Sequence, residues 1–220
     1  MDWRVLGTKI EHLRPHQILG YYTYQGLNRA LRLDLVRGFC LKPGDVRLSA
    51  APSEGVLSER LDEARLRREA EVSGSGLSIS DVESCLAGGE ECFGVFVDGV
   101  LASHAWYASG AARLRAGVNV RFDSRYAYSR WAFTRPEYRG RALHAIGKRY
   151  ALEHYVAAGR SGILATVKVG NFESLSSAAR LGSRPVGIML AASLGHRSLL
   201  WSSAGCRPYG MALEVEPPAP

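Results

Sequence analysis

Two arginines and a glycine lie where one segment changes from a strand-like to a helix-like pattern of residues. The stretch "FTRPEYRGRALHAIGKRYALEHYVAAG" (133–159) starts with strand-like residues, and apolar residues at helical spacing follow Pro136. The first N–H groups of a helix have no partner inside the helix, and the helix dipole is positive there. Because Arg139, Gly140 and Arg141 stand at this point, the segment predicts a site for a phosphate or pyrophosphate, which Gly140 lets the backbone approach closely.

The local charge supports an anion site. Residues 121–149 contain eight basic side chains against two acidic ones, a net charge of +6, whereas the whole chain carries +7. The basic residues are Arg121, Arg125, Arg130, Arg135, Arg139, Arg141, Lys148 and Arg149, and the acidic ones are Asp123 and Glu137. A solvated basic surface would explain the arginines alone, but their position at a strand-to-helix turn favours a bound anion.

Two motifs resemble the GNAT N-acyltransferase superfamily, over roughly residues 46–190. The first, "FTRPEYRGRAL", resembles its acyl-CoA-binding motif, in which Arg/Gln-x-x-Gly-x-Gly/Ala opens the central helix. Arg139 matches the first position, whereas Ala142 and His144 stand where the pattern has Gly and Gly/Ala. The second, "VKVGNFESLSSAARLG", is similar to the following strand and helix, with Asn171 opening the helix and a Leu-Gly pair closing it.

The resemblance implies a mixed sheet that splays open between its fourth and fifth strands, with an acyl-CoA, foremost acetyl-CoA, in the gap. The pantetheine arm would hydrogen-bond along the backbone of one strand, and the diphosphate would bind the turn before the helix. These roles fall on Ala132, Phe133 and Thr134 for the pantetheine, and on Arg139, Gly140, Arg141, Ala142, Leu143 and His144 for the diphosphate. Asn171 would bond the pantetheine arm, cap its helix, or do both.

In this superfamily an amine attacks the thioester directly, so the site needs a base for the amine. His104 is the leading candidate, because imidazole titrates near neutral pH, although a strand histidine is also commonly packed and hydrogen-bonded. Tyr126 and Tyr128 are rivals on the strand expected to carry the cofactor, and Glu137 is a rival beside the turn before the helix, unless it only caps that turn.

The acid that would protonate the leaving thiolate is less evident. In many relatives it is a tyrosine on the helix after the Asn, and that position is Ala178 here. Ser177 or Ser176 would then donate a hydrogen bond instead, unless these serines only solvate the helix surface.

The elements expected to position these residues form an α/β (α+β) fold, a single domain whose central mixed, mostly antiparallel sheet is flanked by helices. Apolar spacing and turn residues predict helices over 18–41, 58–72 with Ser58 as N-cap, 78–89, from Pro136 to about 158, and 171–182. Strands are predicted over 46–50, 92–97, 100–110, 116–123, 126–134, 162–169, 184–194 and 199–203, those from 92 to 134 as a consecutive antiparallel meander with a turn at Asp98-Gly99.

The chain is divided by these patterns into a GNAT-like domain (46–212), an N-terminal extension (1–45) and a flexible tail (213–220). The extension carries a basic amphipathic pattern with Tyr21, Tyr22 and Tyr24 near its start. It would cover the acceptor groove, dock an acidic acyl-carrier protein or rest on an anionic membrane, unless it packs on the core of the domain.

Composition narrows the class of protein. The chain has 220 residues, of which 46% are hydrophobic and 22% charged, as in an ordinary globular domain. The four cysteines lack metal-ligand spacing, so no metal site or disulfide framework is expected, and a reducing cytoplasm fits best. No run of about 18 apolar residues and no signal-like N-terminus occurs, which predicts a soluble protein without a transmembrane segment.

The resulting hypothesis is a cytoplasmic enzyme that transfers an acetyl group from acetyl-CoA to an amine of a small molecule. Two alternatives remain open: transfer of a long acyl chain from CoA or an acyl-carrier protein, and a non-catalytic module that binds a ligand or nucleic acid. No nucleic-acid partner is expected, because the basic residues cluster at one turn. Exposed strand edges would allow a homodimer, but no interface is indicated.

Overall fold

The computed structural model describes residues 33–47, 54–194 and 197–216. The strands are β1 (Asp34–Leu41), β2 (Val56–Leu61), β3 (Glu91–Val97), β4 (Val100–Ala108), β5 (Ala112–Arg115), β6 (Val118–Arg121), β7 (Tyr126–Thr134), β8 (Gly162–Lys168), β9 (Arg184–Leu194), β10 (Arg197–Ser202) and β11 (Ala212–Val215). The α-helices are α3 (Glu63–Glu71), α4 (Ile79–Ala87), α5 (Leu143–Ala157) and α6 (Phe172–Leu181), and the 3₁₀ turns are η1 (Pro43–Asp45), η2 (Pro136–Tyr138) and η3 (Ala204–Tyr209).

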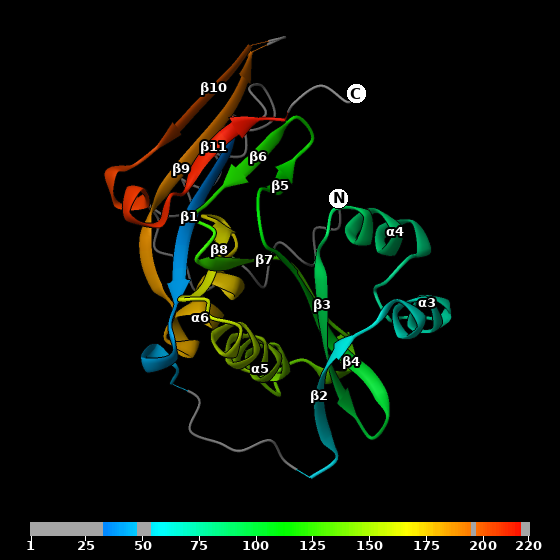
Figure 1. The fold of residues 1–220 in the computed structure, drawn as a ribbon. Coiled ribbons are helices and arrows are strands. Elements are labelled where there is room, and N and C mark those ends of the chain that lie inside the picture. Colours follow the sequence, from blue (N-terminus) through cyan, green and yellow to red (C-terminus); the bar gives the residue numbers. More distant parts are fainter. Residues whose placement is uncertain (1–32, 48–53, 195–196, 217–220) are drawn as a thin grey trace, which may run out of the picture.

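Eight strands form one mixed sheet in the order β10-β9-β1-β8-β7-β4-β3-β2. Within the described strands, β7 and β8 run parallel and the other neighbours are antiparallel. The predicted fold class, a mixed and mostly antiparallel sheet flanked by helices, is therefore confirmed (Figure 1).

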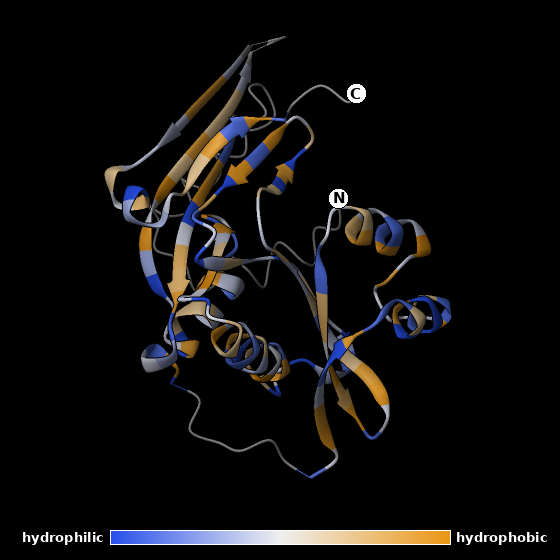
Figure 2. Ribbon diagram, viewed as in Figure 1, coloured by the Kyte–Doolittle hydropathy of each residue, from blue (hydrophilic) through white to orange (hydrophobic). Residues whose placement is uncertain are grey.

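Helices and a second sheet cover the two faces of the main sheet. The core under α5 includes Phe93 and Ala127, whereas Cys92, one residue earlier on β3, belongs to the core under α3 and α4. Since neighbouring strand residues point to opposite faces, α5 and the α3–α4 pair lie on opposite sides (Figure 1). The small sheet β11-β6-β5 packs with Tyr126 and Tyr128 on the face away from α5. In Figure 2 apolar residues are prominent on strands of both sheets, and helix α3 is largely polar.

The helix predicted over 18–41 is wrong where the structure describes it, because residues 34–41 form strand β1. This strand pairs with β8 on one side and β9 on the other, so Val36 and Cys40 are buried in the interior of the sheet. The closely spaced apolar residues of a strand buried on both faces imitate a helical pattern. Residues assigned to the extension thus contribute a central strand, while 1–32 lie outside the described residues. A strand was also predicted over 46–50. Residues 46–47 belong to no strand, and residues 48–50 lie outside the described residues.

The helix predicted from Ser58 begins later. Ser58 lies in strand β2, which pairs with β3, and α3 starts at Glu63. Asp62 is the actual N-cap, because its carboxylate accepts a 2.7 Å hydrogen bond from the N–H of Arg65. Ser and Asp are about equally good N-cap residues, so the sequence alone did not separate Ser58 from Asp62, and strand pairing with β3 decides between them.

The predicted meander is interrupted. Strands β3, β4 and β7 do pair consecutively, and the turn at Asp98-Gly99 joins β3 to β4. The hairpin β5–β6, however, lies outside the main sheet, and its strand β6 pairs with β11. Residues 213–215, which were predicted to belong to a flexible tail, therefore lie in a strand. The predicted helix at 78–89 is confirmed as α4, and so are α5, β8, α6, β9 and β10.

Candidate functional site

The strands β7 and β8 separate partway along their length. Their parallel pairing ends at Ser129 and Ala165, while β7 remains paired with β4 as far as Thr134. The register between β4 and β7 shifts at this point, so that Arg130 is an extra residue, a β-bulge that bends the strand. In the part of the chain that the structure describes, the side of residues 130–134 that faces away from β4 therefore has no strand partner.

The turn that follows η2 presents unused backbone donors. Gly140 has φ of +81°, and no atom lies within 4 Å of the position that a Cβ would occupy. Ala142 adopts φ of 56°, the left-handed region that Gly adopts without strain, which matches the Gly of the motif that this residue replaces. Within the described residues, none of the N–H groups of residues 140–144 donates a hydrogen bond, whereas Ala145 and Ile146 both donate to the carbonyl of Ala142. Five consecutive donors thus remain available to a ligand.

The basic residues of the segment divide into two groups. Five are paired with carboxylates, namely Arg121 with Glu214, Arg125 with Asp123, Arg130 with Glu90, Arg135 with Glu137 and Arg149 with Glu153. Among the described residues, Arg139, Arg141 and Lys148 have no carboxylate partner. The exposed Arg139 contacts the carbonyl of Thr134 at 3.4 Å, and Arg141 lies over the ring of Tyr138 at 5.6 Å. The uncompensated cations are those of the turn and the first half of α5.

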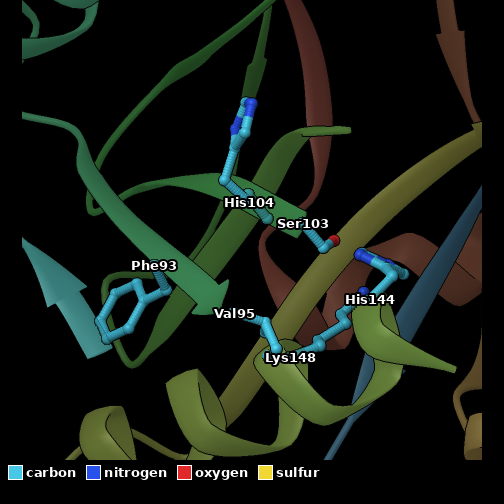
Figure 3. A pocket seen from close by; sticks show the side chains of 8 residues that line it. Phe93, Val95, Ser103, His104, His144 and Lys148 are labelled. Carbon is cyan, nitrogen blue, oxygen red and sulfur yellow. The ribbon is translucent and has the colours of Figure 1, made fainter. Parts of the chain in front are cut away.

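A narrow crevice lies between α5 and the strands β3 and β4. It is lined by Phe93, Val95, Ser103, His104, Ala105, His144, Gly147 and Lys148. Figure 3 shows His144 and Lys148 extending from α5 toward Ser103, while the ring of His104 points away from them. The Ser103 hydroxyl lies 2.8 Å from that of Thr134, at the end of β7. The crevice therefore adjoins the point where β7 leads into the turn at residues 139–144.

Burial shifts both titratable groups that α5 places in this crevice. The pKa of Lys148 is lowered to about 8 by burial, and 6% of this residue is exposed. The pKa of His144 is lowered to about 4 by burial and, secondarily, by the Lys148 charge. At neutral pH the lysine is thus largely a buried cation and the histidine is neutral.

His104, the predicted base, lies on the opposite face of the sheet. Its Nε2 is 3.2 Å from the carbonyl of Ser75, and its ring centroid is 5.7 Å from that of Phe133. Burial lowers its pKa to about 4, against the opposing effect of the Ser75 hydrogen bond. The loop that carries Ser75 is held by Arg135, whose side chain donates to the carbonyls of Ser73 and Leu101. His104 is neutral and enclosed here, so its role as a base stays a prediction.

Tyr128 lies at the fork between the two strands. Its buried hydroxyl is 2.6 Å from that of Thr166, which stands on β8 one residue past the last paired position. Burial raises the pKa of Tyr128 to about 12, although Thr166 and Arg130 oppose the shift. The phenol therefore remains protonated at neutral pH and can serve as a hydrogen-bond donor.

The remaining predicted residues lie on β7 and α6. Ala132 is exposed, and Phe133 and Thr134 are half-buried, all on the stretch of β7 without a partner toward β8. The side chain of Asn171 accepts a 3.2 Å hydrogen bond from the N–H of Ser174, so its capping role is present. Ser177 is half-buried in α6, and its side chain forms no hydrogen bond within the described residues.

Sequence reasoning missed three residues near the site. Lys148 was counted as one basic residue among eight, without a signal that it would be buried. Ser103 and Thr166 come from β4 and β8 and meet β7 through sheet pairing. Alternation along β4 would have placed Ser103 opposite His104, but which face holds α5 depends on the tertiary fold.

Every helix in the described residues is too short or too polar to cross a membrane. No group of three or more His, Cys, Asp or Glu side chains in the same residues is placed to hold a metal ion.

The fold is similar to solved structures of acetyltransferases at low sequence identity. A protein from Novosphingobium aromaticivorans, described as an acetyltransferase from the GNAT family, is 21% identical, and the match covers 73% of this chain and 64% of that chain with a TM-score of 0.49. A GCN5-related N-acetyltransferase from Kribbella flavida is 16% identical, with 74% of this chain and 60% of that chain covered and a TM-score of 0.49. The protein AAC(6')-Iy, in complex with the bisubstrate analogue CoA-S-monomethyl-acetylneamine, is 15% identical, with 58% and 89% covered and a TM-score of 0.45.

The chain spans less than two thirds of the length of the first two of these structures. No family model and no curated protein matches the chain. The similar structures include GNAT-family acetyltransferases, the superfamily that the two sequence motifs resemble.

Proposed function

We propose that the chain is a GNAT-type N-acyltransferase that transfers an acetyl group from acetyl-CoA to an amine of a small molecule. The proposal is carried by one observation: the unpaired edge of β7 leads directly into a turn with five free N–H groups and two unpaired arginines. An extended arm that ends in a diphosphate fits this succession, since a strand edge binds amides and a helix start binds phosphate.

The residues that would hold the donor are those of the edge and the turn. Ala132, Phe133 and Thr134 offer backbone groups to the pantetheine arm, and the turn at 139–144 offers N–H groups to the diphosphate. When bound there, acetyl-CoA supplies the activated acyl thioester for attack by the amine. Gly140 supports the fit, because the space that a Cβ would occupy is open.

Tyr128 is the side chain best placed to assist at the fork. A phenol with a pKa of about 12 is a weaker acid than a thiol, whose usual pKa is about 8.5, so complete proton transfer to the sulfur is uphill by roughly 4 to 5 kcal/mol. Tyr128 is therefore assigned as a hydrogen-bond donor to the leaving sulfur, which takes its proton from water. His104 and Ser177 stay predictions for the base and for a second donor.

We include a cytoplasmic location and a CoA-borne acyl donor in this proposal. All four cysteines are free and buried, which suits a reducing cytoplasm. Long-chain donors, an acyl-carrier protein and a homodimer stay alternatives, because no described residue favours them specifically.

The test is a ligand titration read out by thermal unfolding. Acetyl-CoA, longer acyl-CoAs and free CoA are added to the protein and to the variant Arg139→Ala/Arg141→Ala. The control is Arg121→Ala/Arg125→Ala, which removes the same charge from two arginines that are paired with carboxylates. A ligand at 100 times its Kd stabilises the folded state by about 2.7 kcal/mol, so the unfolding midpoint of the protein and of the control is expected to rise by several degrees.

A smaller rise in the turn variant alone would support the donor site. Release of free thiol from the preferred acyl-CoA, followed with a panel of small amines, then identifies the acceptor. The proposal fails if no acyl-CoA shifts the midpoint of the unmodified protein, or if the control loses the shift as fully as the turn variant.

A further inference from the structure

The lysine in the second turn of α5 is buried without a counter-charge. Lys148 is 6% exposed and lines the crevice with His144 and Ser103. Within the described residues no carboxylate pairs with it, and burial is the main influence on its pKa. Buried lysines are ordinarily paired, because taking an ammonium ion out of water without a partner is costly.

The fold itself gives no reason for this cation. Gly147 and Val95 line the same crevice, and Phe93 and Ala105 complete an apolar wall that a methionine side chain would suit as well. A charge kept at a cost to stability indicates a ligand that compensates it, as at other functional sites.

The position of Lys148 specifies the ligand. It stands four residues after His144 and therefore on the same face of α5, and long helical side chains point toward the N-terminus of their helix. Figure 3 shows both side chains directed toward Ser103, whose hydroxyl meets that of Thr134 where β7 runs into the turn. The ammonium group of Lys148 and the free N–H groups of residues 140–144 are thus both directed toward the N-terminal end of α5. A ligand with more than one negative charge would satisfy both.

We propose that Lys148 provides a buried third cation, besides Arg139 and Arg141, for the diphosphate of the acyl donor. This inference rests on the proposed function and deepens it. A diphosphate carries two charges, whereas the phosphodiester that joins pantetheine to a carrier protein carries one. Lys148 therefore selects a CoA-borne acyl group over one borne by an acyl-carrier protein.

The experiment measures binding of CoA, pantetheine and inorganic pyrophosphate by calorimetry to the protein and to Lys148→Met. The matched control is Lys168→Met, which makes the same change at an exposed lysine paired with Asp34. Lys148→Met is expected to weaken CoA and pyrophosphate by about 10-fold or more, the usual effect of losing a charge-assisted hydrogen bond. Its binding of pantetheine, which lacks phosphate, is expected to stay within twofold, and Lys168→Met is expected to bind all three like the unmodified protein.

Thermal unfolding of Lys148→Met without ligand verifies that the variant folds. The inference is overturned if this folded variant binds CoA as tightly as the unmodified protein, or if pantetheine weakens as much as CoA. Failure of the proposed function looks different, because the unmodified protein would then bind no CoA. Pyrophosphate binding that depends on Lys148 would in that case still support the anion site.

Discussion

At the scale of single residues, the site combines groups that burial has moved away from their ordinary chemistry. Lys148 and His144 both have lowered pKa values, to about 8 and about 4, so burial disfavours protonation of both groups in the crevice. The backbone of Ala142 is also held in an unfavourable state. It adopts the left-handed conformation, which costs about 1 kcal/mol or more for a residue with a Cβ. Such local costs are common where a ligand later compensates them.

The Lys148 charge predicts how stability depends on pH. Its pKa falls from 10.5 in the unfolded chain to about 8 in the folded one, so the folded state binds the proton more weakly. Below pH 8 the full cost is present, about 3 kcal/mol, and it disappears as the pH rises from 8 to 10.5. Lys148→Met should therefore be more stable than the unmodified protein at pH 7, by up to this amount, and lose the advantage toward pH 10.

Urea unfolding of both proteins between pH 6.5 and 10 measures this difference. Two other titratable groups near the crevice and α5 affect stability in a different pH range or in the opposite direction. The pKa of His144 on α5 affects stability below 6.5, and burial raises the pKa of Cys40 on β1 to about 11, which lowers stability above pH 9. The effect of the Lys148 charge on the pKa of His144 acts below pH 6.5, outside the measured range, and burial, the main cause of the Cys40 shift, is the same in both proteins. A difference that does not change with pH would show that Lys148 is not a buried cation.

At the scale of elements, the fork between β7 and β8 determines what the site can do. The bulge at Arg130 turns this side chain toward Glu90, which binds it at 2.6 Å, and leaves the following residues of β7 without a partner toward β8. Tyr128 and Thr166 stand at the closed end of the fork, and the turn at residues 139–144 follows the open end. An acyl donor that spans the two would place its thioester near Tyr128.

Substitution of the tyrosine tests that placement. Tyr128→Phe removes the hydroxyl but keeps the ring stacked on Phe122 at 5.3 Å, so the fold should persist. We expect kcat to fall by about 100-fold, as when other enzymes lose one hydrogen-bond donor to developing charge, with KM for acetyl-CoA changed by less than about threefold. Steady-state thiol release measures both constants.

Thr166→Val is the matched control for this substitution. It removes the same 2.6 Å hydrogen bond but leaves the Tyr128 hydroxyl free to donate. Its kcat is expected to stay close to that of the unmodified protein. An unchanged kcat in Tyr128→Phe, or an equal loss in both variants, would contradict a direct role of the hydroxyl.

The elements also show how far sequence reasoning reaches. The segment from β7 to α6 was predictable, because its signals are local: Pro136 and Gly140 before α5, and Asn171 before α6. Strand β1 was not, since a strand buried by β8 and β9 reads as a helix until its neighbours are known. Residues whose role comes from pairing between distant strands, such as Thr166, carry no local signal. The charge count was correct, but it could not separate the paired Arg135 from the unpaired Arg139.

At the scale of the whole molecule, ion pairs reduce the number of cations that the most basic segment offers to a ligand. The chain carries a net +7, yet five of the eight basic residues between 121 and 149 face carboxylates. Nucleic-acid binding by charge needs several unpaired cations along a continuous surface. Within residues 121–149, the cations left by this pairing lie at one helix start, which suits a compact polyanion.

This distribution predicts discrimination between two kinds of anion. At 150 mM salt, acetyl-CoA is expected to bind, whereas a labelled single-stranded oligonucleotide should bind more weakly than about 100 µM, the weak end of non-specific affinities. Fluorescence anisotropy with acetyl-CoA as competitor measures both, and Arg139→Ala/Arg141→Ala should weaken acetyl-CoA specifically. Oligonucleotide binding in the low micromolar range, steeply dependent on salt and displaced by acetyl-CoA, would instead identify the turn as part of a nucleic-acid surface. The chain would then be a binding module whose turn at residues 139–144 contacts the phosphates of a nucleic acid, and the hydrogen bond assigned to Tyr128 would have no substrate.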